Sequence, residues 1–229
     1  MFDPHSPEIL RASLKKLQEA AFSKRMQTLQ EYEDWYVGGT TVSKYLMRNP
    51  GEKDDSFNAR VSRVCHMNYV GRIVDEIVDD VYGDEVTRSY GAGEEAADER
   101  LKETLEWNSI IDTQQDWCRS QVLLGEGWAN VTWRDDPGMV AIFGVHPIDA
   151  WWRGDPNNPG RMVEFVETRP SDLPNLPADL TGNVYTHWIW NEREYCEVNN
   201  RGEYIIPPTP NPYGVIPYVR WKGRSIVGY

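Results

Sequence analysis

The stretch LLGEGWANVTW, residues 123–133, divides the chain into two parts with different periodicities. Before it, apolar residues recur at the three- and four-residue spacing that is typical of amphipathic helices. After it, short aromatic and β-branched segments alternate with turn signals, which is typical of antiparallel strands. Gly125 and Gly127 lie at the change, where a residue without a Cβ lets a helix end and a strand begin. Helices followed by a run of strands predict an α+β fold.

The first helix is predicted to start at Pro7, with Ser6 as its N-cap and Glu8 in the first turn, where a carboxylate meets the positive helix end. Apolar residues then recur on a slowly drifting face as far as the pair Gly38–Gly39. We therefore expect one long amphipathic helix. Its Lys and Glu residues are mixed rather than segregated, which favours a packed or partner-facing helix over a membrane-surface helix.

Further helical segments follow in the same part of the chain. One runs from Phe57 to Gly83, and a second pattern ends at Gly125 after a break near Asn108–Ser109. A short strand is expected between them, within GDEVTRSYGAGEE. We assign residues 1–126 to a mainly helical part.

Residues 127–229 are assigned to an antiparallel, β-rich part. The strand pattern occurs in WANVTW, MVAIFGVH, RMVEFVET, VYTHWIW and EYCEVN. Between them lie RDDPG, DPNNPG and NNRG, whose residues favour turns. Pro207, Pro208 and Pro210 predict one more turn.

Composition and charge exclude several classes of protein. The chain has 229 residues, of which 40% are hydrophobic and 26% charged, so it can bury a core and is not a disordered protein. No apolar run reaches the roughly 18 residues of a membrane span, and no targeting segment is recognisable. Of the net charge of −12, the segment from Asp75 to Asp112 carries −10. Such a chain lacks the cationic surface of a protein that grips DNA.

Motifs for catalysis, cofactors and metals are not found. The sequence lacks the glycine-rich phosphate loops, the nucleophile elbow and the paired metal-ligand spacings. Asp149, Asp155 and Asn157 have no calcium-loop spacing and are interpreted as turn formers. We predict no catalytic, cofactor-binding or metal-binding residue, and we interpret the three cysteines as structural thiols of a reducing compartment. These cysteines are Cys65, Cys118 and Cys196.

The ten tryptophans are the main compositional anomaly, and four of those in the β-rich part are singled out here. Alternation places Trp188 and Trp190 on one face of their strand. A role in the core or at a subunit interface is favoured for these side chains, because aromatic residues dominate buried contacts. A platform that stacks sugars or bases is the alternative. The four candidates for interface aromatics are Trp151, Trp152, Trp188 and Trp190.

Five segments, in this order, resemble the N-terminal half of portal proteins of tailed bacteriophages. They are YEDWYVGG, NYVGRIVDEIVDDVYGD, LLGEGWANVTW, VHPIDAWW and NPYGVIPYVRW. Each alone has little specificity, whereas their order over nearly the whole chain is more specific. The positions that match the family's motifs are Tyr32, Tyr36, Gly38, Asn68, Asp75, Gly125, Gly127, Pro147, Asp149, Pro212, Gly214 and Pro217.

The resemblance implies a structural function without catalysis. Portal subunits form a dodecameric ring at one capsid vertex, nucleate head assembly and bind the terminase, and they contact the major capsid protein and the head–tail adaptor. Double-stranded DNA passes through the ring without sequence-specific binding. The implied location is the virion, after assembly in the host cytoplasm, with no cofactor and no membrane. An acidic wall would let a polyanion slide without sticking.

The resemblance covers the wing-like region of a portal, and NPYGVIPYVRW resembles the strand that leaves this region toward the stem helices. We therefore expect an N-terminal portion of a longer portal, and a divergent protein that keeps only this portion is the alternative. Two other classes remain open. One is a Trp-rich ligand-binding or adaptor module of a virion, and the other is a metal-dependent enzyme that uses His146 and His187.

Overall fold

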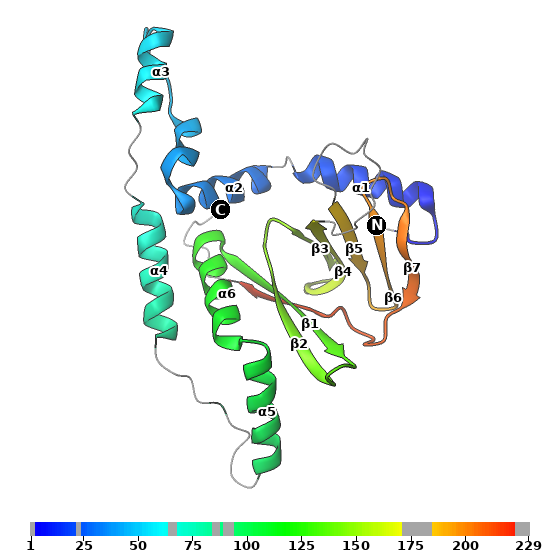
Figure 1. Ribbon diagram of the computed structural model, residues 1–229. Coiled ribbons are helices and arrows are strands. Elements are labelled where there is room, and N and C mark those ends of the chain that lie inside the picture. The colour runs from blue at the N-terminus through cyan, green and yellow to red at the C-terminus, as the bar shows by residue number, and fades with distance from the viewer. Residues whose placement is uncertain are drawn as a thin grey trace. The chain divides into compact units, whose positions relative to one another are not determined.

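The computed structural model describes residues 3–21, 24–63, 68–83, 88, 94–170 and 185–222. The chain divides into two compact units. Of the described residues, unit 1 contains those up to Met26 and Gly127–Trp221, and unit 2 contains Gln27–Glu126 and Lys222. In the described part of the chain every helix precedes every strand (Figure 1), so the predicted α+β class is confirmed.

Unit 1 contains helix α1 (Pro7–Ala21) and two sheets. The five-stranded sheet has the order β3-β4-β5-β6-β7, and each neighbouring pair in it is antiparallel. The three-stranded sheet has the order β2-β1-β8. The strands are β1 (Glu126–Arg134), β2 (Met139–Val145), β3 (Ala150–Asp155), β4 (Asn158–Pro170), β5 (Tyr185–Trp190), β6 (Glu194–Asn199), β7 (Tyr204–Pro210) and β8 (Tyr218–Lys222).

One face of the five-stranded sheet is covered by α1, which lies across its strands (Figure 1). Leu10 and Leu14, one helical turn apart, pack there against Val166 and Ile189. All four side chains are almost fully buried, and burial of each stabilises the fold by about 1.5–3 kcal/mol. The first helix is therefore held by the strands of unit 1.

The other face of this sheet packs against the three-stranded sheet. Because successive side chains of a strand point to opposite faces, Phe165 and Trp190 lie on this side, while Val166 and Ile189 face α1. Phe165 stacks on Tyr218 of β8 with ring centroids 3.9 Å apart and contacts Trp128 of β1 at 5.0 Å. The core of unit 1 is thus aromatic on one side of the sheet and aliphatic on the other.

Unit 2 is helical. In it α4 packs against α6, and α5 also contacts α6 (Figure 1). The buried side of α4 carries Gly71, Val74 and Val78. The helices are α2 (Lys24–Val37), the 3-10 helix η1 (Gly39–Tyr45), α3 (Asp54–Ser62), α4 (Tyr69–Tyr82), α5 (Glu95–Trp107) and α6 (Ile110–Leu124).

The predicted boundaries of the helices are partly confirmed. The first helix begins at Pro7, α4 is followed by Gly83, and the break near Asn108–Ser109 separates α5 from α6. Ser109 has a φ of 44°, in the left-handed region, so the helix cannot continue through it. Gly125 ends α6 with a φ of 79°, which a residue without a Cβ adopts at little cost.

The expected single long helix is described as two helices, α1 and α2, and residues 22–23 between them lie outside the described residues. Each buries a different face in a different unit, which explains the drift of the apolar pattern. Leu10 and Leu14 face strands, whereas Leu29 and Asp34 are buried in unit 2. The helical pattern from Phe57 to Gly83 is likewise described as two helices, α3 and α4.

Two strands were not predicted, β3 and β7. Pro207, Pro208 and Pro210, interpreted as a turn, lie in β7 at the edge of its sheet. An edge strand tolerates proline because one side of its backbone needs no ladder donor. The expected strand within GDEVTRSYGAGEE falls almost wholly outside the described residues. The division into residues 1–126 and 127–229 shares the Gly127 boundary with the two units, but it groups α1 with the helices, whereas α1 packs on strands.

Candidate functional site

Three positions marked by the resemblance come together in unit 2, where α2 meets α4. The Tyr36 hydroxyl donates to Asp75 Oδ1 at 2.9 Å, and Asn68 Nδ2 donates to the Tyr36 carbonyl oxygen at 2.6 Å. Asn68 Oδ1 also accepts the Gly71 N–H at 2.8 Å and so caps α4. A Cβ at Gly71 would lie 2.9 Å from the Tyr36 oxygen, so the contact needs glycine there. Gly38 follows α2 directly and donates its N–H to the Asp34 carbonyl oxygen.

This cluster is an anchor between helices. Arg119 of α6 adds a contact from Nε to Asp75 Oδ1 at 3.1 Å. Burial, and then the hydrogen bond to Asp75, raise the pKa of Tyr36, so its hydroxyl stays protonated and keeps donating. Tyr32 is 38% exposed and does not join the cluster.

A buried carboxylate of the YEDWYVGG segment, Asp34, was not singled out from the sequence. It is 7% exposed, lies 2.6 Å from Lys44 Nζ and accepts a hydrogen bond from the Tyr45 hydroxyl. Burial opposes its ionisation, but the bonds from Lys44 and Tyr45 outweigh that cost and lower the pKa of Asp34. Asp34 therefore ties α2 to η1.

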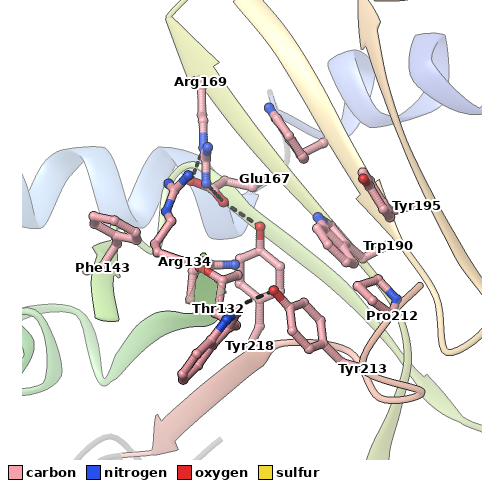
Figure 2. A pocket seen from close by; sticks show the side chains of 14 residues that line it. Thr132, Arg134, Phe143, Glu167, Arg169, Trp190, Tyr195, Pro212, Tyr213 and Tyr218 are labelled. Carbon is pink, nitrogen blue, oxygen red and sulfur yellow. Dashed lines mark hydrogen bonds and ion pairs between the residues drawn. The ribbon is translucent and has the colours of Figure 1, made fainter. Parts of the chain in front are cut away.

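Unit 1 contains a pocket of about 490 Å³ lined by residues of both sheets (Figure 2). This volume lies within the range of pockets that hold small ligands. Asn130, Thr132 and Arg134 line it from β1, and Glu167 and Arg169 line it from β4. The rest of the wall is largely aromatic, so the pocket combines apolar surface with a few polar groups.

A carboxylate with three hydrogen bonds lies in the wall of this pocket. Glu167 is only 6% exposed and accepts from Arg169 through both oxygens, at 2.5 and 2.7 Å. The Tyr218 hydroxyl donates to Glu167 Oε2 at 2.6 Å (Figure 2). Burial, and then the adjacent Glu167, raise the pKa of Tyr218 well above its ordinary value. The buried charge is therefore paired with a cation and a neutral donor.

The aromatic wall is a set of nearly parallel rings. Trp190 stacks on Tyr195 with centroids 4.4 Å apart and planes at 13°, and Trp188 lies 6.1 Å from Tyr195 at 5°. The Arg169 guanidinium lies 5.3 Å from the centre of the Trp188 ring. The flat faces of these rings are thus engaged within the protein, which leaves less free ring face for stacking a sugar or a base than the platform alternative requires.

Of the four tryptophans that the sequence singled out, Trp188 and Trp190 line the pocket. Trp151 and Trp152 are neighbours on β3 and therefore face opposite ways. Trp151 packs with the cluster under α1, and Trp152 packs with the aromatic cluster. All four contribute to contacts within unit 1.

The other motif positions of unit 1 have backbone roles. Pro147 is fully buried, and the Asp149 carbonyl oxygen accepts the Thr168 N–H at 2.9 Å. Pro217 is buried, and its carbonyl oxygen accepts the Val131 N–H at 2.8 Å, which fixes the chain before β8 against β1. The remaining three are Gly127, buried in β1, Pro212, which lines the pocket, and Gly214, at a φ of 66°.

The residues considered for metal binding are engaged in other contacts, among them His146, whose Nδ1 accepts the Ile148 N–H at 3.3 Å. His187 is buried between Thr168 Oγ1 at 3.1 Å and Asn200 Oδ1 at 2.9 Å, and burial lowers its pKa. Asp155 Oδ1 accepts the Asn157 N–H at 2.8 Å, as in an Asx turn. Within the described ranges, no group of three or more His, Cys, Asp or Glu side chains is placed to hold a metal ion.

The two cysteines that the structure describes are free thiols. Burial raises the pKa of Cys196 to about 12 and also raises the pKa of Cys118. A thiol with a raised pKa forms little thiolate and is unreactive, in agreement with the structural role expected from the sequence. Cys65 lies outside the described residues.

Sequence reasoning missed the polar residues of the pocket. The only feature of the sequence that could have indicated these polar residues is the pair of charges in FVETR. There Glu167 and Arg169 lie on either side of Thr168, on a strand that is otherwise mostly apolar. Arg134 lies in RDDPG, which was interpreted only as a turn, and Tyr213 lies in NPYGVIPYVRW without having been singled out there. Their proximity to Glu167 depends on the pairing of the two sheets.

No helix in the described part of the chain is long and apolar enough to span a membrane. No protein-family model matches the chain, and no curated protein sequence matches it significantly.

Proposed function

We propose that the chain is the wing-like portion of a portal subunit of a tailed bacteriophage. In this proposal copies of the chain contribute to a ring at one capsid vertex, through which double-stranded DNA enters and leaves. The terminase, the major capsid protein and the head–tail adaptor are the proposed partners, the virion is the proposed location, and the chain performs no catalysis.

The observation that carries the proposal is the convergence of the resembling segments. In unit 2, YEDWYVGG and NYVGRIVDEIVDDVYGD are joined through Tyr36, Asn68 and Asp75. In unit 1, the aromatic cluster contains Trp128 of LLGEGWANVTW, Trp152 of VHPIDAWW and Tyr218 of NPYGVIPYVRW. Segments that are far apart in sequence thus meet within each unit, and in unit 2 they meet at three positions that the resemblance marks, as expected if they form one framework.

An exposed apolar row on α4 favours assembly. Tyr69, Ile73 and Val81 are 58%, 55% and 56% exposed, and Ile77 between them is 39% exposed. Their four-residue spacing places them along one side of the helix. A row of this kind on a soluble protein is typical of a surface that another chain covers.

The exposed acidic residues of α4 and α5 are consistent with a surface that lines a DNA channel. Glu76, Asp79 and Asp80 of α4 are exposed, as are Glu99, Glu103 and Glu106 of α5. Charges of this sign repel phosphate, so such a surface would let DNA pass without holding it.

The oligomeric state tests the proposal. The purified chain, examined by light scattering and negative-stain electron microscopy over a hundredfold dilution, is expected to form closed rings at high concentration. Ile73→Glu is expected to leave only monomers, because it places a charge in the apolar row.

Arg72→Glu is the matched control, because it changes the charge of a neighbouring exposed residue on the same helix without altering the row. Circular dichroism should show equal helix content in both variants. A chain that stays monomeric at every concentration, or rings that Ile73→Glu leaves intact, would count against the proposal.

A further inference from the structure

The pocket of unit 1 contains Arg134, an arginine that forms no ion pair with any of the residues that the structure describes. Arg134 is exposed at the end of β1, and its guanidinium lies 5.6 Å from the centre of the Phe143 ring. Within the described ranges no carboxylate forms an ion pair with it. Figure 2 shows the Arg134 and Arg169 side chains converging on the same side of the pocket, next to Glu167.

The net charge of the residues that line the pocket indicates which charge a ligand should carry. Arg134, Arg169 and Glu167 are the charged residues of the lining, and the last two pair with each other. One positive charge therefore remains. A carboxylate, with a single negative charge and a planar fork of acceptors, matches a guanidinium better than a phosphate monoester, which carries about −1.5 to −2 at pH 7.

The chemistry of the aromatic wall also favours an anionic ligand. The rings of Trp188, Trp190 and Tyr195 lie face against face, and ring edges are the electropositive part of an aromatic side chain. Trp190 Nε1 is buried and has no hydrogen-bond partner among the described residues. A buried N–H without an acceptor is unfavourable, so a ligand that supplies an oxygen to this wall would be stabilised.

We propose that this pocket binds a carboxylate attached to a flat apolar group, with the carboxylate at Arg134 and Arg169. The apolar group contacts Phe143, which is 44% exposed, and Tyr213, while the rings of Trp188, Trp190 and Tyr195 stay stacked on one another. The carboxylate comes either from a peptide, as an acidic side chain next to an aromatic one, or from a free small molecule. This binding site is independent of the proposed ring, because all of its residues belong to one unit of one chain.

Calorimetric titration of the full chain tests the site with defined probes. N-acetylphenylalanine represents the free small molecule, and a blocked peptide with Glu next to Phe represents the protein source. N-acetylphenylalaninamide has the same shape as the first probe without its charge, and phenyl phosphate has a higher charge. We expect one of the two carboxylate probes to bind at least tenfold more tightly than the amide and than phenyl phosphate, and the tighter carboxylate identifies the source.

Arg134→Gln is expected to weaken binding of the carboxylate about tenfold, and Arg134→Lys to weaken it less, because the lysine keeps the charge but loses the planar fork. Arg193→Gln is the control, since Arg193 is exposed at the turn between β5 and β6 and does not line the pocket. An unchanged heteronuclear NMR spectrum outside the pocket shows that Arg134→Gln is folded.

Three results would overturn the inference. They are binding of neither carboxylate, equal binding of the amide, and equal loss in Arg134→Gln and Arg193→Gln. Tighter binding of phenyl phosphate would overturn the assignment of a monoanion. None of these results bears on ring formation, which is measured without a ligand.

Discussion

The two units differ in where they keep their apolar side chains. Unit 1 buries Trp128, Phe165 and Trp190 between its sheets and pairs its buried carboxylates with arginines. Unit 2 leaves a row of large apolar side chains on α4 exposed beside several acids. Unit 1 therefore obtains most of its stabilisation internally, whereas unit 2 retains apolar area whose burial by a partner would be favourable.

The largest expected effect is in the aromatic core of unit 1. Phe165→Ala removes a ring that is 0% exposed and packed against Tyr218 and Trp128, so we expect the free energy of unfolding to fall by about 3–5 kcal/mol. Urea denaturation followed by tryptophan fluorescence measures this loss. Phe143→Ala is the control, because Phe143 is 44% exposed and its removal should cost less than about 1 kcal/mol. Equal losses would show that the core is not where the structure places it.

A smaller change in stability is expected from substitutions in α4, and it should differ between the buried and the exposed side of this helix. Val78 is 0% exposed and Val81 is 56% exposed, and both are valines of the same helix. Val78→Ala should therefore destabilise the monomer by about 2 kcal/mol, because it leaves a cavity. Val81→Ala should change the monomer by less than about 0.5 kcal/mol and should instead weaken any association of copies. Thermal denaturation and sedimentation of both variants check this contrast, and a stable Val78→Ala variant would contradict it.

Removing the hydrogen bond that anchors α2 to α4 is expected to lower the free energy of unfolding by a smaller amount. Tyr36→Phe removes the hydrogen bond to Asp75, and we expect a loss of about 1 kcal/mol in the free energy of unfolding. Tyr32→Phe, on the same helix but exposed, should be neutral. If chemical denaturation shows the same stability for the two variants, the anchor contributes nothing.

The smallest effect depends on pH and belongs to unit 1. Burial holds the pKa of His187 below its ordinary value of 6.5, so the unfolded chain binds a proton at a higher pH than the folded chain does. The stability from this group is complete above pH 6.5 and falls as the pH is lowered toward the folded pKa. Denaturation curves of His187→Gln should show a shallower loss of stability below pH 6.5.

Local signals in the sequence predicted much of the fold. Pro7 and Gly125 mark helix ends by their own backbone preferences, and they do so in the structure. Alternating aromatic and β-branched residues predicted five of the strands, because alternation reflects burial of one face. Proline misled the prediction at β7, because its effect depends on whether a strand lies at an edge or in the centre, and the sequence does not carry that information.

The α+β class, the boundary at Gly127 and most of the helix ends could be predicted from the sequence alone, because these features depend on residues close together in the chain. Only the tertiary structure decided that α1 belongs with the strands, that Trp151 and Trp152 enter different clusters, and that Arg134 and Arg169 converge on one pocket. These features depend on contacts between segments far apart in sequence. Such contacts are set by which faces pack together, and no local pattern encodes that choice.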